Sequence, residues 1–335
     1  MRCSCGAGRA RASADLVEPG GRSKLLSCRI LFRKTGSHFC GECSRLYRAI
    51  ASSRRTARPA MIKDILVHLS PGERRDPGAD FSLSVAALFG ASLTGVAFAY
   101  EPVIPPSVFG TIPAELIAAQ KQQSVKAAAA PAARFQEGLR LADLHGGTRI
   151  LDAGVPVSGD VFGRLARLFD LSIVTQAEPD SLGAEDLVVE GALFEAGRPV
   201  LVVPYVQTAG ITLERVVVAW DGSRQAARAC ADSLPFLTKA TRVEVVMVSG
   251  ERPKAGEVQG ADVAQHLARH DIKVEVKRIS EAGGIGETLL SYAADSGADF
   301  LVMGGYGHSR LREFVLGGAT RGILDAMTLP VLLSH

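Results

Sequence analysis

Glycines recur at a fixed spacing close to the C-terminus of this 335-residue chain. Gly304 and Gly307 follow an apolar run, and Gly317 and Gly318 come after nine further residues. Because glycine has no Cβ, the backbone N–H groups around it can turn toward an anion. The second glycine pair precedes a helical segment, whose first turn adds N–H donors and a partial positive charge. Two such features around one loop predict a cradle for a phosphate group.

A carboxylate ends another apolar run, 214–221, in the sequence Asp221-Gly222-Ser223. Asp221 is placed to accept hydrogen bonds from the ribose or base of a nucleotide. The alternative is an ordinary turn or helix cap, and Ser223 is a residue type that caps helices. Ligands of open parallel sheets bind beyond the carboxyl ends of the strands, near the point where the strand order reverses. We therefore expect the carboxylate and the glycines at that edge.

The spacing Gly304-x-x-Gly307, nine residues, then Gly317 resembles the signature of the universal stress protein family, which continues with Ser or Thr. The run Gly-His-Ser-Arg-Leu-Arg-Glu-Phe at 307–314 is also typical of that family. The resemblance implies a Rossmann-like fold that binds ATP, with or without Mg²⁺, or another adenine nucleotide. It places the Asp221 position on the nucleotide and the end of the second strand near the base. The nucleotide-binding residues that follow are Asp221, Gly222, Val248, Gly304, Gly307, His308, Gly317, Gly318, Ala319 and Thr320.

One position departs from the family signature, because the Ser or Thr expected after Gly317 is Gly318. A hydroxyl that would bind phosphate is therefore missing, although the backbone N–H remains. Thr320 is close enough in sequence to substitute. Losing one neutral hydrogen bond costs about 0.5–1.5 kcal/mol, so we expect affinity to fall about tenfold without binding being abolished. His308 has two interpretations, a phosphate contact or a loop histidine facing solvent.

The chain beyond residue 60 contains an internal repeat of apolar runs separated by helical stretches. Short buried strands that alternate with helices of about 10–15 residues predict a parallel sheet with right-handed crossovers. We predict an α/β fold of two tandem Rossmann-like domains of the adenine nucleotide alpha hydrolase type, each a five-stranded parallel sheet with helices on both faces. The predicted strands are 63–70, 92–99, 149–152, 170–174 and 199–203, repeated as 214–221, 241–248, 273–277, 299–303 and 330–333.

The predicted organisation is a basic leader at 1–60, a degenerate domain at 61–204, a linker at 205–212 and a nucleotide-binding domain at 213–335. The family resemblance is strongest in the last of these and weaker in the degenerate domain. An excursion at 101–146 is predicted as an Ala/Gln-rich helix interrupted near Pro131. The residues predicted to share helix faces in the second domain are Ala226, Cys230 and Leu234, then Val263 and Leu267, then Ile285, Leu289 and Ala293.

The degenerate domain lacks the features of the cradle. Ser70 stands in the place of Asp221, and Thr175-Gln-Ala-Glu178 replaces the first glycine pair. A carboxylate there repels phosphate, and Glu185-Asp186 near the second pair does the same. We therefore expect no nucleotide in this domain. The last strands of the two domains are expected to pair, which makes a pseudo-dimer within one chain, and two chains could associate further.

Charge and cysteine content differ between the leader and the rest. The leader holds 13 Lys/Arg against 3 Asp/Glu, so the remainder of a chain with net charge +3 is acidic. This balance argues against nucleic acid as a partner, and no apolar run approaches the roughly 18–20 residues of a membrane span. Only Cys230 lies beyond the leader, which predicts a reducing compartment such as the cytoplasm. The leader, with His38, Cys40 and Cys43, is interpreted as a disordered tail upstream of a start at Met61, rather than as a zinc site or secretory signal.

Three functions are compatible with these features. The first, which we predict, is a regulatory stress-response protein whose conformation or partners change when an adenine nucleotide binds. The second is an enzyme, an ATPase or adenylyl transferase; the sequence has no P-loop and no adenylating-enzyme motif, which leaves at most slow hydrolysis in the cradle. The third is a scaffold that has lost ligand binding, which Gly318 favours and the intact glycine spacing opposes. No catalytic or metal-binding residue is assigned.

Overall fold

The computed structural model describes residues 62–71, 75–101, 113–178, 184–249, 260–305 and 318–335. The predicted leader, with His38, Cys40 and Cys43, lies outside these residues, and so do the predicted site residues Gly307 and His308 together with Gly317. Among the residues that are described, no helix is long and apolar enough to cross a membrane.

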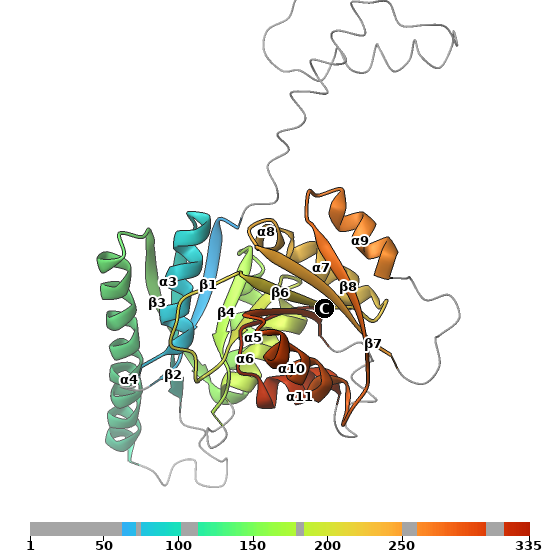
Figure 1. Ribbon diagram of the computed structural model, residues 1–335. Coiled ribbons are helices and arrows are strands. Elements are labelled where there is room, and N and C mark those ends of the chain that lie inside the picture. The colour runs from blue at the N-terminus through green and yellow to red at the C-terminus, as the bar shows by residue number, and fades with distance from the viewer. Residues whose placement is uncertain (1–61, 72–74, 102–112, 179–183, 250–259, 306–317) are drawn as a thin grey trace, which may run out of the picture. The chain divides into compact units, whose positions relative to one another are not determined.

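A ten-stranded sheet runs through the described residues in the order β3-β2-β1-β4-β5-β10-β9-β6-β7-β8 (Figure 1). Every strand predicted from the sequence is present, and all neighbours but one pair in parallel. The first half, residues 62–204, contains β1 (Asp64–Leu69), β2 (Ser92–Glu101), β3 (Gly146–Gly154), β4 (Leu171–Thr175) and β5 (Val200–Val203). The second half, residues 213–335, contains β6 (Arg215–Ala219), β7 (Arg242–Ser249), β8 (Val274–Ser280), β9 (Phe300–Gly304) and β10 (Val331–Ser334).

The exception is the antiparallel pair β5–β10, here called the seam, in which Val202 lies opposite Val331 and Val200 lies opposite Leu333. It confirms the predicted pairing of the two last strands. The order β3-β2-β1-β4-β5 of the first half recurs as β8-β7-β6-β9-β10 in the second. Because the seam is antiparallel, the two halves are related as a two-fold pair, and their carboxyl-terminal strand ends lie at opposite edges of the sheet.

Helices cover both faces of the sheet and bury two apolar layers against it. Both layers cross the seam, since the first contains Ile65 and Val216 and the second contains Leu66 and Val217. The helices on the first layer are α3 (Pro77–Phe89), α4 (Ala114–Leu141), α7 (Arg224–Asp232), α8 (Leu234–Leu237) and α9 (Gly260–Ala268). Those on the second layer are α5 (Val155–Ala166), α6 (Ala184–Glu195), α10 (Ile285–Ser296) and α11 (Ala319–Ala326).

Two helices differ from the prediction. Helix α4 is continuous through Pro131, because Ala128 and Phe135 on either side bury one stripe against the sheet and offset the single lost hydrogen bond. The predicted face that joined Ala226, Cys230 and Leu234 is split, since α7 ends at Asp232 and Leu234 begins the short helix α8. Proline at position 235 has no N–H to continue the α7 ladder.

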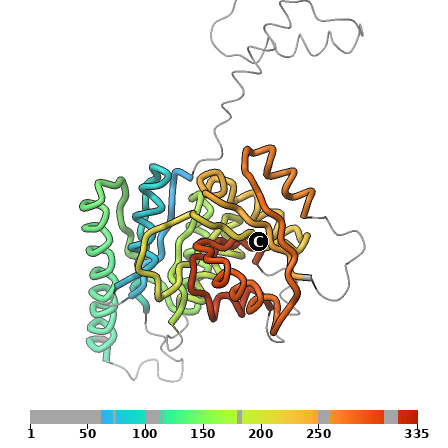
Figure 2. Tube along the Cα trace, viewed as in Figure 1, coloured from blue at the N-terminus to red at the C-terminus, as the bar shows by residue number. Residues whose placement is uncertain are grey.

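The segment between the halves lies along α3, and its path from β5 to β6 can be followed in Figure 2. The Ile211 N–H donates to Ser84 Oγ at 2.8 Å. The Arg75 Nη2 donates to the Thr208 carbonyl at 3.1 Å. The predicted linker is therefore held against the first half by hydrogen bonds.

Candidate functional site

The strand order of the second half reverses between β6 and β9, because β7 and β8 follow on one side of this pair and β10 on the other. Such a reversal leaves an opening at the carboxyl ends of the strands, where open α/β sheets bind ligands. Asp221 follows β6, and Gly304 is the last residue of β9. The structure thus places both predicted segments at the reversal point.

The turn after β6 is built by short-range hydrogen bonds. Asp221 Oδ1 accepts from the Ser223 N–H at 2.9 Å, and Gly222 between them has a φ of 76°, which favours glycine. Ser223 Oγ then accepts from the Ala226 N–H at 3.1 Å and caps α7, as predicted. Asp221 itself is exposed, so its second carboxylate oxygen is accessible from solvent.

Gly304 brings the end of β9 against the first turn of α7. A Cβ added at this residue would lie 2.5 Å from the Ala226 backbone nitrogen and 2.6 Å from the Gln225 carbonyl carbon. Because both are backbone atoms, any side chain here would force α7 away from the sheet. The glycine is therefore required by packing. That packing holds the Asp221 turn beside Gly304, the first residue of the predicted glycine segment, 304–318.

The second predicted glycine pair is described from Gly318 onward. Gly318 is the N-cap of α11, with a φ of −68°, and is exposed; no atom of the described residues lies within 4 Å of the place of a Cβ. No side chain of the described residues caps this helix. Ala319 is half-buried and Thr320 is 5% exposed. Arg321 is exposed and paired with Asp325 at 3.6 Å.

Val248, predicted to lie near the base, is half-buried close to the carboxyl end of β7, which neighbours β6. It packs against the second apolar layer. Trp220 and Cys230 are buried. Burial raises the pKa of the Cys230 thiol to about 11, so this thiol is held in its unreactive protonated form.

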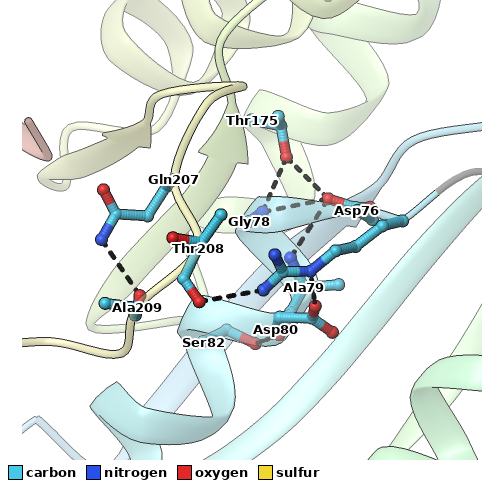
Figure 3. A network of polar contacts seen from close by, with 10 residues as sticks. Asp76, Gly78, Ala79, Asp80, Ser82, Thr175, Gln207, Thr208 and Ala209 are labelled. Carbon is cyan, nitrogen blue, oxygen red and sulfur yellow. Dashed lines mark hydrogen bonds and ion pairs between the residues drawn. The ribbon is translucent and has the colours of Figure 1, made fainter. Parts of the chain in front are cut away.

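The equivalent edge of the first half is filled by a buried carboxylate, Asp76 (Figure 3). Its Oδ1 accepts from the Gly78 N–H at 3.1 Å, the Ala79 N–H at 3.2 Å and Thr175 Oγ1 at 2.7 Å. Its Oδ2 accepts from the Ser70 N–H at 2.8 Å. Asp76 therefore caps α3 and joins the ends of β1 and β4.

Thr175 ends β4 as Gly304 ends β9, so a hydroxyl stands where the second half has bare backbone. Thr175 Oγ1 also accepts from the Gly78 N–H at 3.0 Å. Sequence reasoning found the replacement of the glycines by Thr175-Gln-Ala-Glu178 but missed Asp76. The signal was Asp followed by Pro at the start of a helix, a common N-cap arrangement.

Acidic side chains gather around this edge of the first half. Burial raises the pKa of Asp76, which the hydrogen bonds from Thr175 and the backbone oppose. Burial also raises the pKa of Glu185, and the charges of Asp76, Asp186 and Glu178 raise it further. Glu178, predicted to occupy the phosphate position, is exposed. Across the described residues no group of three or more His, Cys, Asp or Glu side chains is arranged to hold a metal ion.

This chain resembles known proteins both in sequence and in fold. Residues 212–335 match the family model described as the universal stress protein family. Universal stress protein Slr1230 from Synechocystis is 29% identical over 127 residues, which cover 36% of this chain and 42% of that protein. Universal stress protein MJ0577 from Methanocaldococcus jannaschii is 33% identical over 63 residues, covering 19% of this chain and 39% of that protein. The matches thus span less than half the length of these curated relatives.

The fold comparison extends over both halves. The crystal structure of a universal stress protein from Archaeoglobus fulgidus superposes with a TM-score of 0.61 at 14% identity, and the match covers 82% of this chain and 96% of that one. At this identity the likeness concerns the fold, an α/β architecture built on a largely parallel sheet. The sequence match identifies residues 212–335 as a universal stress protein family domain, and the shared fold extends over both halves of the chain.

Proposed function

We propose that this chain is a regulatory stress-response protein of the cytoplasm that binds ATP, or a related adenine nucleotide, in its second half. One observation carries the proposal. The approach of Gly304 to the first turn of α7 holds the Asp221 turn beside the glycine segment at the reversal of strand order. That edge is where ligands of open α/β sheets bind.

Each part of a nucleotide has a matching group at this edge. The N-terminus of α11 offers backbone N–H donors and a partial positive charge to phosphate, with exposed Gly318 leaving room for close approach. Asp221 is accessible to accept hydrogen bonds from the ribose, and half-buried Val248 offers an apolar contact for the base. Mg²⁺, when it accompanies ATP, would be held mainly by the phosphates, since it keeps several waters and takes few protein ligands.

We propose one nucleotide for each chain. In the first half the cap of α3 is already occupied by the Asp76 carboxylate, and Glu185 and Asp186 add negative charge nearby. An incoming phosphate would meet like charge at a partly buried site. The alternative function is a tandem scaffold without ligand, which the absence of a capping hydroxyl at Gly318 favours.

Replacing Gly318 with glutamate tests the proposed site directly. The backbone at Gly318 accepts any residue, and its side-chain position is empty, so the fold should tolerate the change. The new carboxylate would stand where phosphate approaches α11. We expect the dissociation constant for ATP, measured by titration calorimetry on the full chain, to rise by about 100-fold or more.

The matched control is Gly322→Glu, which adds the same charge one turn further along α11, also at an exposed position with no neighbour within 4 Å. It should bind ATP nearly as well as the parent. Equal weakening in both variants would indicate a general charge effect and not a site at Gly318. Absence of heat and of a thermal shift in the parent at millimolar ATP would leave the scaffold alternative.

Restoring the family residue makes the opposite prediction. Gly318→Ser places a hydroxyl at the N-cap, where it can donate to a phosphate oxygen. We expect the dissociation constant for ATP to fall about tenfold, in keeping with one added hydrogen bond. The helix itself should gain only a few tenths of a kcal/mol, since glycine is already an acceptable N-cap. Gly322→Ser, with the same change in composition, should leave affinity unchanged.

A further inference from the structure

Residues of the first half contact the segments that flank the proposed nucleotide site. Leu193, near the end of α6, lies directly against Gly305: a Cβ on this glycine would be 2.7 Å from Leu193 Cδ2. The Gly305 N–H donates to the Ser334 carbonyl at 2.8 Å. The residue after Gly304 is therefore enclosed between β10 and a leucine that comes from the other side of the seam.

A second contact from the first half reaches α11. The Gln176 side chain is buried, and its Nε2 donates to the Leu324 carbonyl at 2.7 Å. Its Oε1 accepts from the Tyr205 N–H at 3.3 Å, so the amide is fixed at both ends. The helix whose N-terminus would hold phosphate is thus tied to the end of β4.

Further contacts join the same regions. His335 Nδ1 lies 3.1 Å from the Gly305 carbonyl oxygen, and its ring packs edge-on against Phe194 of α6 at 4.9 Å between centroids. From α7, Arg228 Nη2 donates to the Gly197 carbonyl at 3.3 Å. At the edge of the proposed site, α7 and Gly305 therefore touch the first half, whereas Gln176 meets α11 near the C-terminal end of that helix, at the opposite edge of the sheet.

The two-fold relation of the halves makes the asymmetry of these contacts clear. Gln176 and Gly305 are equivalent positions, because the N–H of each donates to the last residue of the neighbouring strand, Val203 and Ser334 respectively. Only the first-half member carries a side chain, which reaches across to α11. Its glycine counterpart leaves the space that Leu193 fills. Of these two related contacts, the one between Leu193 and Gly305 is the one that lies at the edge of the proposed site.

We propose that Leu193 is a positioning residue for the nucleotide site of the second half, so that the first half acts as a permanent support for a site it does not itself contain. Leu193 fixes Gly305, the residue that follows β9. Its side chain does not need to touch the nucleotide. This inference rests on the proposed function, because it assigns the parts that set the affinity of that same site.

The test compares two buried leucines of the first half. Leu193→Ala removes the contact with Gly305, whereas Leu139→Ala creates a similar cavity under α4, at the far side of the first half. ATP is titrated calorimetrically into each full-length variant well below its unfolding temperature. We expect Leu193→Ala to raise the dissociation constant about tenfold and Leu139→Ala to leave it unchanged, although both lower stability.

Two further variants separate positioning from general damage. Leu193→Met keeps the volume and should restore affinity to near the parent value. Gln176→Ala, which removes the related contact at the opposite edge of the sheet, should leave the affinity for ATP near that of the parent. Amide hydrogen exchange at Gly305, measured without nucleotide, should be faster in Leu193→Ala than in Leu139→Ala. The reason is that the hydrogen bond from the Gly305 N–H to the Ser334 carbonyl is no longer shielded from water by the Leu193 side chain.

The failures of the inference and of the proposed function can be told apart. A parent protein that binds ATP, together with equal affinities for Leu193→Ala and Leu139→Ala, overturns the inference alone. A parent that binds no ATP overturns the proposed function and this inference with it. Equal weakening by the two leucine variants would show that lost stability, and not the contact with Gly305, controls affinity.

Discussion

Replacing Asp76 with alanine is expected to lower the free energy of unfolding by about 4 kcal/mol, the sum of a lost helix cap and buried donors left without acceptors. The carboxylate accepts four hydrogen bonds, from three backbone N–H groups and from Thr175 Oγ1. Since the residue is only 8% exposed, water cannot easily take its place. Urea unfolding at neutral pH measures the change.

The natural control is Ser223→Ala, because Ser223 caps α7 in the second half as Asp76 caps α3 in the first. Ser223 accepts one hydrogen bond, so its loss should cost only about 1 kcal/mol. Asp76→Asn should fall between the two, since the amide keeps one acceptor oxygen but presents an N–H to one of the donors. If the alanine variants of Asp76 and Ser223 lose equal stability, the Asp76 network contributes no more than a simple cap.

The second large effect concerns His68, which lies on β1 with its ring between Phe98 and Phe162, each 5.9 Å away between centroids. The side chain is fully buried, and neither ring nitrogen has a hydrogen-bond partner among the described residues. Burial lowers the pKa of His68 from 6.5 to about 4. The unfolded chain therefore binds a proton more tightly than the folded one, so stability is complete above pH 6.5 and is lost as the pH falls toward 4.

We expect this one group to remove about 3 kcal/mol of unfolding free energy across that window, at 1.36 kcal/mol for each pKa unit. His68→Leu should abolish this part of the pH dependence. It should also add about 1–3 kcal/mol at neutral pH, because two buried polar atoms without partners are removed. The measurement is the difference between parent and variant in urea unfolding at pH 7.5, 5.5 and 4.5, which cancels the contribution of the carboxyl groups.

His145→Leu, which removes an exposed histidine of the same half, is the comparison variant measured under the same conditions. A constant difference between His68→Leu and the parent at all three pH values would contradict the explanation, because it would mean that the His68 ring does not take up its proton upon unfolding in this range.

The strands were predictable because each has a recognisable pattern in its own residues. Val200–Val203 and Val331–Ser334 are short apolar runs buried on both faces, and such runs have few alternatives to a central parallel strand. The repeat added the topology, since two copies of one pattern predict two copies of one strand order. The interruption near Pro131 was predicted wrongly, because local propensity does not reveal the buried stripe that carries α4 through the proline.

The candidate site was predictable only in part. Asp221, Gly222 and Gly304 could be recognised because they follow strands and form local turns. The hydrogen bond between Thr175 and Asp76 joins residues 99 positions apart, and the contact of Leu193 with Gly305 crosses the seam. Such pairs depend on how whole elements pack, and the residue types alone do not indicate which residues will be in contact. The sequence predicted the first half as a degenerate domain that pairs with the second, but the proposed support of the nucleotide site by Leu193 could not be recognised from it.

The antiparallel seam also has a consequence for assembly. Its two strands belong to one polypeptide, so each is presented to the other at an effective concentration set by the tether, of about millimolar order for short flexible links. A pair of separate chains dissociates on dilution and exchanges mates, whereas this pair does neither. Every molecule therefore contains one half whose strand-end edge is occupied by its own Asp76 carboxylate and one half without such a carboxylate, always in a one-to-one ratio. At protein concentrations well below this effective concentration, pairing within one chain therefore outcompetes pairing between the second halves of two chains across the seam.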